Sequence, residues 1–442
     1  MKLNKRYLPL IFSCIVLLLG CQQTQNNTND ISLSRSEYKE KLYGFWLAQC
    51  IANWTGLVTE MDKIGIPNPE GKGGGFYTSA DWGQPDQLNI WGASDLSDSI
   101  TFLYAVKDSI WGADDDTDIE YIYQELLNQH QTTQLTGDQI RDGWLNHINK
   151  EEENFLWVSN QRAFDLMLEG VVPPATSDPV NNVHYEMIDA QLTTEIFGFF
   201  APTRPDVALE MSHLPIRTTA RENAAWIAEF NVIMYALAPI ETAHQSVKEK
   251  TQWMAEQARK RLPESSYAAK MYDFVKAQYD SGVKWETARD ELHEKYQVRQ
   301  EDGYLWATKD ESCNGCFAAG INFGASIVSL LYGEGDLKET IKIGALCGWD
   351  SDNPTATWGG LLGFMLGKEG VEKVFDTTFA DQFNIHRTRK GFKNNGVDTF
   401  DQMAAKGVAI VDRVVQEKMN GTIKDDQWIF PKTALIIPSI KE

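Results

Sequence analysis

The chain has 442 residues, of which 43% are hydrophobic, and its formal net charge at pH 7 is −21. A chain of this length with so many apolar residues can bury a large core. The strongly acidic balance argues against nucleic acid and anionic membrane surfaces as partners, because both carry charge of the same sign.

The first 20 residues have the features of a bacterial lipoprotein signal peptide. Three basic residues precede an apolar run at 8–19, which is shorter than the roughly 20 residues of a membrane-spanning helix. Leu-Leu-Gly-Cys at 18–21 then resembles a lipobox. We therefore expect residues 1–20 to be removed, Cys21 to carry lipid, and residues 21–33 to form a polar tether. An uncleaved anchor helix is the alternative.

The pattern after the tether is helical. Apolar side chains recur at helical spacing in segments 38–46, 119–126, 224–238, 253–262, 268–279 and 320–332. Alternating strand patterns are few, and no Pro/Ser-rich linker interrupts the chain. We therefore expect an all-α fold, with one large compact multi-helix domain at 34–442 and a C-terminal extension from about residue 375.

A further predicted helix carries glycines at every fourth position. Gly359, Gly363 and Gly367 would line one face of this segment and allow another backbone to approach closely. A glycine pattern of this kind also occurs in membrane helices that dimerise, but the apolar run here is too short. A tightly packed core helix is therefore expected.

Cys313 and Cys316 have the C-x-x-C spacing of redox and zinc sites. The sequence offers no second pair of cysteines or histidines to complete a zinc site, and no thioredoxin-like strand pattern surrounds the pair. Two buried thiols, or a local disulfide outside the cytoplasm, are expected instead.

Two clusters of acidic residues lie far apart in apolar, helix-like surroundings. The first acidic cluster is Asp-Asp-Asp-Thr-Asp at 114–118, and the second acidic cluster is Asp-Ser-Asp-Asn at 350–353. Helix N-capping would explain one or two acids, but not three consecutive aspartates. Carboxylates repel one another and are costly to bury uncompensated. A hard divalent cation held between the two clusters is therefore the leading interpretation.

Two other acidic patterns were weighed against this metal site. In an EF-hand, residues 114–125 would supply ligands at loop positions 1, 3, 5 and 12, but Ile119 stands where that loop requires glycine. Asp95 and Asp98 could also be ligands, although we expect them to cap a helix through residues 100–103. The sequence contains no nucleophile elbow, P-loop or dinucleotide fingerprint.

Three motifs in order resemble the ADP-ribosylglycohydrolase family, which includes the dinitrogenase reductase-activating glycohydrolase. Residues 44–60, which end in Glu60, are similar to the family's G-D-A-L-G-x-x-x-E. The first acidic cluster is similar to T-D-D-T-E, and residues 348–353 are similar to G-G-D-T-D-T. Asp-Ala-Gln-Leu at 189–192 echoes a weaker family segment. The resemblance covers roughly residues 38–370.

This resemblance implies an all-α domain with a site for two metal ions, usually Mg²⁺ and sometimes Mn²⁺. By position, the metal ligands would be Glu60, Asp114, Asp115, Asp116, Asp350, Asp352 and Asn353. Glu60 would be a ligand or a nearby base that activates water, and with Asp115 and Asp352 it forms the expected catalytic set. Paired cations orient substrate and lower the pKa of bound water, as cleavage of a glycosidic bond requires.

The chain departs from the family pattern at three positions. Asn53 stands where aspartate is usual, and Asp114 and Asn353 each replace threonine. Asn353 still offers a carbonyl oxygen, so metal coordination should survive more easily than substrate preference. Beyond the core match, the basic residues Arg387, Arg389 and Lys390 could meet an anionic substrate or form a solvated face.

The expected function is that of a metal-dependent glycohydrolase that cleaves an N- or O-glycosidic bond. The substrate would be an ADP-ribosyl group or a related ribosyl or furanosyl sugar, on a small molecule or glycan. The lipobox places the enzyme in the bacterial cell envelope, facing the periplasm or exterior, where cytoplasmic ADP-ribosylated proteins would not reach it. Its membrane contact would be through the N-terminal lipid only. The alternative is a catalytically inactive, metal-stabilised surface binding protein.

Overall fold

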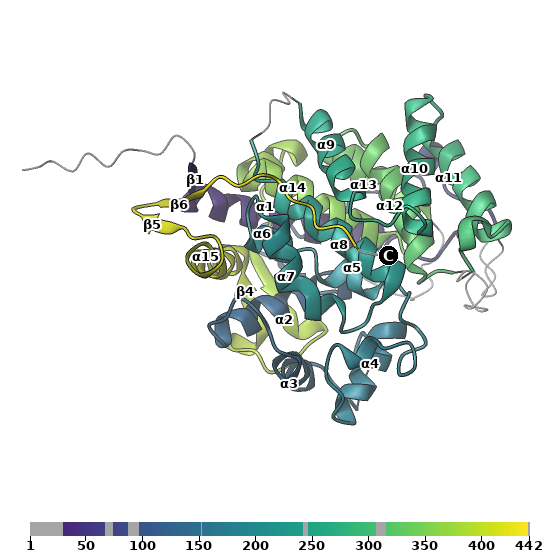
Figure 1. Cartoon of the computed structure of the whole chain (residues 1–442). Helices are drawn as coiled ribbons and strands as arrows, with labels where there is room; N and C mark the ends of the chain where they lie inside the picture. The colour runs from purple at the N-terminus through teal and green to yellow at the C-terminus, as the bar shows by residue number, and fades with distance from the viewer. Residues whose placement is uncertain are drawn as a thin grey trace, which may run out of the picture.

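The computed structural model of the chain describes residues 30–66, 74–86, 97–151, 153–241, 246–305 and 315–440. These residues form a predominantly helical body with two small sheets at its edge (Figure 1). The α-helices are α1 (Arg35–Gly56), α2 (Asp115–Gln129), α3 (Gly137–His147), α4 (Val158–Leu168), α5 (Asp189–Thr193), α6 (Phe197–Phe200), α7 (Pro205–Ile216), α8 (Glu222–Leu237), α9 (Val247–Arg259), α10 (Tyr267–Asp280), α11 (Trp285–His293), α12 (Ala319–Tyr332), α13 (Leu337–Cys347), α14 (Asp352–Phe375) and α15 (Phe400–Glu417).

The all-α prediction is confirmed, and the six predicted segments correspond to α1, α2, α8, α9, α10 and α12. The EF-hand interpretation is wrong, because α2 begins at Asp115 and leaves no calcium-binding loop. None of the helices in the described part of the chain is long and apolar enough to cross a membrane.

The helix predicted through residues 100–103 is wrong, because residues 97–109 contain no helix. The backbone at residues 100–103 bonds to groups outside this segment instead of forming helical bonds. The N–H of Ile100 donates to the Gln84 carbonyl at 3.0 Å, and the N–H of Leu103 donates to Thr55 Oγ1 at 3.0 Å. The bond to Thr55 ties the segment to the end of α1, and the bond to Gln84 ties it to the neighbouring loop.

Helices α1 and α14 pack closely along each other and form the centre of the body. An added Cβ at Gly363 would overlap Ala48 and the backbone of Gly44, and one at Gly359 would overlap Ala52. These contacts confirm the predicted close approach at Gly359 and Gly363. The predicted regular helix is wrong at Gly367, where a φ of +69° interrupts α14. The packing sets the C-terminal end of α1 beside the N-terminal end of α14.

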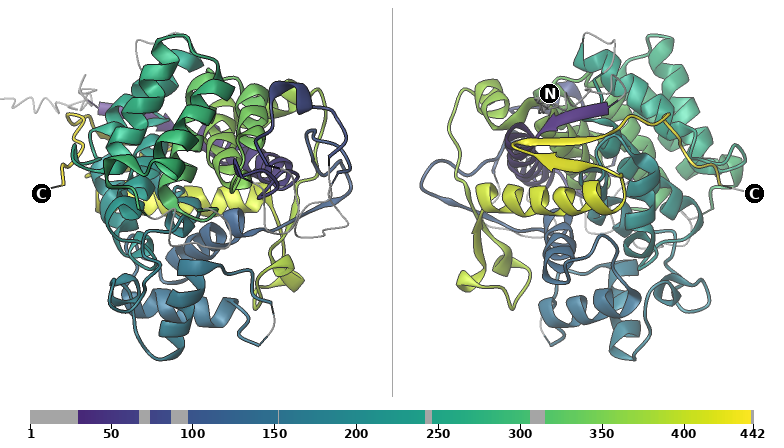
Figure 2. Two further views of the ribbon diagram at one scale, coloured as in Figure 1. Left: turned by 90° about the vertical axis from the view of Figure 1, so that its right-hand side faces the viewer. Right: turned by 60° about the vertical axis from the view of Figure 1, so that its left-hand side comes forward.

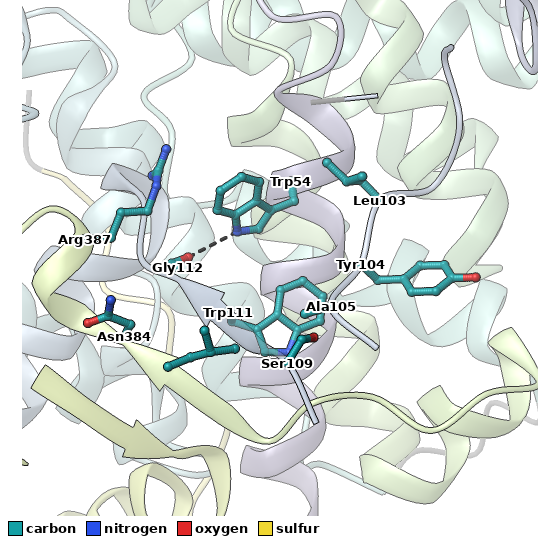
Figure 3. A pocket seen from close by; sticks show the side chains of 10 residues that line it. Trp54, Leu103, Tyr104, Ala105, Ser109, Trp111, Gly112, Asn384 and Arg387 are labelled. Carbon is teal, nitrogen blue, oxygen red and sulfur yellow. Dashed lines mark hydrogen bonds between the residues drawn. The ribbon is translucent and has the colours of Figure 1, made fainter. Parts of the chain in front are cut away.

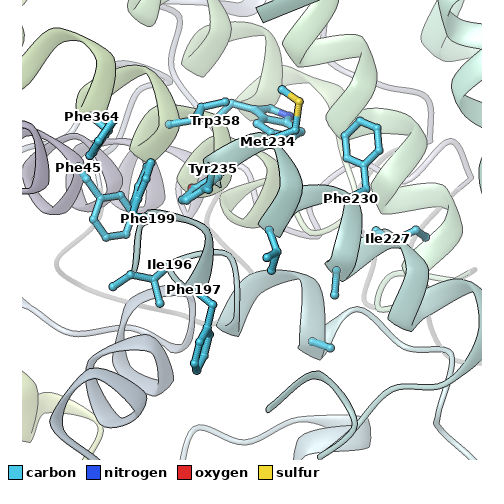
Figure 4. Close-up of a cluster of buried hydrophobic side chains, with 14 of the residues drawn as sticks. Phe45, Ile196, Phe197, Phe199, Ile227, Phe230, Met234, Tyr235, Trp358 and Phe364 are labelled. Atoms are coloured by element: carbon cyan, nitrogen blue, oxygen red, sulfur yellow. The ribbon is translucent and has the colours of Figure 1, made fainter. Parts of the chain in front are cut away.

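Aromatic side chains fill the space between this helix pair and α6 and α8 (Figure 4). Phe199 stacks on Phe364 with ring centroids 4.0 Å apart, and Phe45 meets Phe199 edge-on at 5.2 Å. The buried Tyr235 hydroxyl donates to the Thr357 carbonyl at 2.6 Å. Such buried rings fix the helices relative to one another through both area and geometry.

The strands are β1 (Asp30–Ser34), β2 (Ile110–Gly112), β3 (Gln382–Asn384), β4 (Val397–Thr399), β5 (Thr422–Lys424) and β6 (Gln427–Pro431). One sheet has the order β1-β6-β5 and is antiparallel, with β1 beside the β5–β6 hairpin (Figure 2). In the other, β3 pairs parallel to β2 and antiparallel to β4. The residues beyond 375 thus pack into the same body as the helices.

Several sequence predictions fall outside the described residues. The predicted signal peptide, Cys21, Asp95 and Cys313 all lie there, whereas Cys316 is buried. The predicted tether is too long at its C-terminal end, because residues 30–33 belong to strand β1 and pair with β6.

Candidate metal centre

The first acidic cluster forms the N-terminus of α2. Asp114 is the N-cap residue, with extended backbone, and its N–H donates to Thr117 Oγ1 at 3.0 Å. Asp114 and Asp116 are buried, with 6% and 2% of their surface exposed, and Asp115 is half-buried. The helix start therefore presents three successive carboxylates at the positive end of the helix dipole.

The second acidic cluster follows the turn between α13 and α14. Gly348 has a φ of +92°, a conformation that favours glycine, and a Cβ there would overlap the Lys63 carbonyl. The N–H of Asp350 donates to Asn322 Oδ1 at 3.2 Å, and Ser351 Oγ donates to the Gly56 carbonyl at 2.9 Å. The turn thereby anchors the second acidic cluster to the end of α1.

Glu60 lies in the turns that follow α1, and 6% of its surface is exposed. Residues on both sides of it are tied to the second acidic cluster. Thr59 Oγ1 lies 3.1 Å from Ser351 Oγ, and the N–H of Met61 donates to the Trp349 carbonyl at 2.8 Å. The Glu60 carboxylate is thus held close to Asp350 and Asp352.

The carboxylates from these three segments converge in two overlapping groups. Oxygens of Asp114, Asp115, Asp116 and Asp352 lie within 4.8 Å of one another, and so do oxygens of Glu60, Asp350 and Asp352. Asp352 belongs to both groups, and its buried Oδ1 has no hydrogen-bond partner among the described residues. Clustered carboxylate oxygens of this kind suit hard divalent cations such as Mg²⁺ and Mn²⁺.

Burial and mutual repulsion raise the pKa values of these acids. Desolvation is the largest cause of the raised pKa of Asp115, Asp116, Asp350 and Asp352. Repulsion by Asp352 adds to the raised pKa of Asp116, and repulsion by Glu60 adds to those of Asp350 and Asp352. A bound cation would favour the ionised forms and reverse this effect.

Asn53 lies between the two acidic clusters and is fully buried. Its Nδ2 is 3.2 Å from Asp114 Oδ2, 3.2 Å from Asp116 Oδ2 and 3.5 Å from Asp352 Oδ2. The amide thus donates to carboxylates of both clusters, where an aspartate would add a further negative charge. The sequence showed Asn53 only as a departure from the family pattern and did not indicate this bridging position.

The side chain of Asn353 is turned toward Gln191 of α5. Asn353 Oδ1 accepts from Gln191 Nε2 at 3.2 Å, and Asn353 Nδ2 donates to Asp116 Oδ1 at 3.1 Å. In this orientation the amide positions a carboxylate of the first acidic cluster, and its carbonyl oxygen is already used. The role of Asn353 as a metal ligand therefore stays a prediction.

The three basic residues near residue 388 have different surroundings. Arg387 Nη1 donates to Asp114 Oδ1 at 2.9 Å, which places this guanidinium at the edge of the centre. Arg389 is buried and forms an ion pair with Asp118 at 2.9 Å, where no part of either side chain is exposed. Lys390 lies in a separate surface pocket with residues 149–151. Of the three, only Arg387 contacts the converging carboxylates.

The sequence model of the ADP-ribosylglycohydrolase family matches residues 34–388, which is most of the chain. The chain belongs to this family. It is also similar to a solved structure described as an ADP-ribosylglycohydrolase-related protein complex, with 13% identity and a TM-score of 0.41 over 85% of this chain and 98% of that one. No curated protein matches the chain.

Membership of the ADP-ribosylglycohydrolase family makes the chain a glycosidic-bond hydrolase, as the three motifs indicated. The match ends at residue 388, beyond the span of about 38–370 that the motifs covered, and so includes Arg387. Divalent-metal dependence is typical of the family, and the converging carboxylates could bind metal. The individual ligand and catalytic roles predicted for them stay predictions.

Proposed function

We propose that this ADP-ribosylglycohydrolase uses two divalent cations, Mg²⁺ or Mn²⁺, to hydrolyse an N- or O-glycosidic bond of an ADP-ribosyl or related ribosyl or furanosyl substrate. The observation that carries this proposal is the pair of carboxylate groups that share Asp352. Asp114, Asp115 and Asp116 would hold one cation, and Glu60 and Asp350 the other. Asp352 would hold both.

Protein side chains would position the carboxylates and transfer the proton in this reaction. Asn53 and Asn353 hold the carboxylates of the first acidic cluster in place through their amide N–H groups. Glu60, in the second carboxylate group, would take a proton from the attacking water near the anomeric carbon. The cations, when bound, would orient the sugar hydroxyls and lower the pKa of that water.

The proposed location is the bacterial cell envelope, with the enzyme anchored through lipid on Cys21. The lipobox at 18–21 supports this location. Cells that express the chain and are fed labelled palmitate should incorporate the label into the wild type but not into Cys21→Ala. Equal labelling of both would contradict the anchor. Substrates outside the cytoplasm then become the relevant ones, which favours furanosyl and other carbohydrate substrates over cytoplasmic ADP-ribosylated proteins.

The test of the reaction uses the full chain, purified in detergent and stripped of metal with a chelator. ADP-ribosyl-arginine, ADP-ribosyl-serine and a panel of aryl furanosides and pyranosides are then offered with Mg²⁺ or Mn²⁺. We expect metal-dependent turnover of at least one of them. Asp115→Asn and Asp352→Asn should each weaken metal affinity by at least about 100-fold, because each removes a charged ligand.

Asp280→Asn is the matched control, because Asp280 is an exposed acid whose one ion pair among the described residues is with Lys276 on the same helix. It should leave metal affinity and turnover unchanged. Calorimetry that detects no metal binding to the wild type would contradict the metal centre itself. Metal binding without turnover on the whole panel would instead contradict the proposed substrate class.

A further inference from the structure

A pocket of about 470 Å³ lies between the end of α1, strand β2 and Arg387 (Figure 3). Its walls are mainly apolar and include Trp54, Leu103, Tyr104 and Trp111, and Arg387 lies at one end. Pockets of this size with apolar walls and a few polar groups are typical of small-molecule sites.

The backbone connects this pocket directly to the metal centre. Trp54 follows Asn53 in α1, and its Nε1 donates to the Gly112 carbonyl at 3.1 Å. Gly112 ends β2, two residues before Asp114, and pairs with Asn384 of β3. Groups bound in the pocket would therefore lie next to the first acidic cluster.

The guanidinium of Arg387 is held in position by its surroundings. It lies over the ring of Trp54, 4.7 Å from the ring centre, and 5.7 Å from the ring centre of Phe155. Gly112 leaves the space that the side chain needs, because a Cβ there would overlap Arg387 Cδ. An arginine that is fixed in this way can present its free N–H groups to a ligand with little loss of entropy.

Most N–H groups of Arg387 form no hydrogen bond to the described residues. Nη1 donates to the Ala113 carbonyl at 2.7 Å and to Asp114 Oδ1 at 2.9 Å. The N–H groups on Nε and Nη2 form no hydrogen bond to any residue that the structure describes. A third of the side chain is exposed, and Arg387 is one of the residues that line the pocket, so a ligand at this end of the pocket could reach these donors.

Neutralisation of Asp114 alone would not require this geometry. Arg35 shows the usual arrangement, since its Nε and Nη2 donate to the two oxygens of Asp412 at 2.8 and 2.7 Å. Arg387 instead contacts Asp114 through one nitrogen and leaves its Nε–Nη2 edge free. That edge matches the two oxygens of a carboxylate or phosphate.

We propose, on the basis of the glycohydrolase function proposed above, that this pocket binds the leaving group of the substrate and that Arg387 selects leaving groups carrying a carboxylate or phosphate. The apolar body of the leaving group would rest against Leu103, Tyr104 and Trp111. The sugar hydroxyls would lie near the carboxylates of the candidate metal centre, because polar hydroxyls are better solvated there than against the apolar walls of the pocket. Arg387 is thus a specificity-determining residue.

The kinetic test compares two aryl furanosides that differ only in a carboxylate on the aryl ring. We expect the wild-type full chain, loaded with Mg²⁺, to prefer the carboxylated substrate in kcat/KM. Arg387→Gln should reduce that preference about 10- to 100-fold, since paired charge-assisted hydrogen bonds are lost. Arg387→Lys should restore only part of it, and the control Arg141→Gln, at a surface ion pair, should leave it unchanged.

The ratio of the two substrates separates selection from a general effect on the metal centre. If Arg387→Gln lowers kcat/KM equally for both substrates, the residue only balances Asp114 and the inference is overturned. Two further substrates carry a phosphate or a neutral carboxamide on the aryl ring. The phosphate shows which oxyanion is preferred, and the carboxamide shows whether a negative charge is needed. An equal preference of the wild type for the carboxamide and the carboxylate would also overturn it.

A binding measurement keeps this inference distinct from the proposed function. Calorimetry with benzoate, phenyl phosphate and the neutral benzamide, with and without Mg²⁺, should show Arg387-dependent binding of the two anions. That result without turnover of any glycoside would leave the subsite standing and overturn the proposed substrate class. Anion binding that depends on Mg²⁺ but not on Arg387 would place the anion on the metal and overturn the subsite.

Discussion

Individual polar side chains compensate the buried negative charge of the candidate metal centre when no metal is bound. Asn53 is the clearest case, because its amide donates to carboxylates of both acidic clusters. Asn53→Asp would replace a donor by a further buried negative charge. We expect the free energy of unfolding of the metal-free protein to fall by about 3 kcal/mol, as for other uncompensated buried charges. Saturating Mg²⁺ should restore most of this loss, which thermal denaturation with and without chelator would measure.

Asn395→Asp makes the same chemical change at an exposed position and serves as the control. It should change the free energy of unfolding by no more than about 0.5 kcal/mol, both without metal and with saturating Mg²⁺. If metal-free Asn53→Asp is as stable as the wild type, then Asn53 does not compensate the carboxylates and its position between the clusters has no energetic role.

Arg389 stabilises helix α2, whose N-terminus carries the first acidic cluster. It forms a buried ion pair with Asp118 and donates to the backbone carbonyls of Asn154 and Phe155. Burial raises the pKa of Asp118 to about 6, and Arg389 opposes that rise. Arg389→Met should cost about 3–5 kcal/mol in unfolding free energy, because it leaves Asp118 unpaired. Adding Asp118→Leu should recover part of that loss in urea denaturation, and no recovery would show that the backbone contacts of Arg389 matter more than its charge.

Residue type identified the two aspartate clusters of this centre, and the family resemblance added Glu60, but neither indicated the side chains that hold these acids. Runs of aspartate are conspicuous because burying them demands compensation. Arg387 and Arg389 looked alike in the sequence, and only the pairing of β2 with β3 decides which of them reaches the carboxylates. That pairing joins residues more than 270 positions apart, and it leaves no local pattern.

At the scale of elements, the close contact of α1 with α14 fixes the relative positions of the carboxylates in the candidate metal centre. Gly363→Ala would place a methyl group against Ala48 and the backbone of Gly44 and force the helices apart. We expect a loss of about 2–3 kcal/mol in unfolding free energy from overpacking. Metal affinity should also weaken, because Glu60 follows α1 whereas Asp352 begins α14. Thermal denaturation and metal titration by calorimetry would measure the two effects.

Gly370→Ala, in the part of α14 that follows the break at Gly367, is the matched control, since the three atoms nearest to the added Cβ all belong to the exposed Leu366 side chain. It should leave stability unchanged or raise it by up to about 1 kcal/mol through helix propensity. Wild-type stability and metal affinity in Gly363→Ala would show that α1 and α14 can separate without disturbing the carboxylates.

Helices were predictable where their signal is local. Apolar residues identified six of them, because they recur along one buried face, as in α9 and α10, or all round a buried helix, as in α8 and α12. The helix through residues 100–103 was wrongly predicted, because the backbone there bonds to Gln84 and Thr55, which the spacing of Phe102 and Leu103 cannot reveal. The strands β2, β3 and β4 contain only three residues each, too few for an alternating pattern.

At the scale of the whole molecule, the candidate metal centre makes stability depend on both pH and metal. In the metal-free protein, burial raises the pKa values of the carboxylates at Asp115, Asp116, Asp350 and Asp352. Above about pH 4, the ordinary pKa of aspartate, the folded state then binds more protons than the unfolded state. The contribution of these acids to the unfolding free energy therefore falls as the pH rises from about 4 toward their raised pKa values.

Metal binding should reverse this dependence, because divalent cations bind ionised carboxylates and displace their protons. We expect the gain in melting temperature from saturating Mg²⁺ to be small at pH 5.5 and larger by roughly 5 °C at pH 8. Half-buried histidines such as His147, whose pKa is lowered by burial, titrate in both the metal-free and the metal-bound protein and cancel in this difference. Asp352→Asn should remove most of the gain at pH 8, because Asp352 belongs to both carboxylate groups. An equal gain at both pH values would mean that the stabilising cations bind elsewhere on this acidic chain, away from the converging carboxylates.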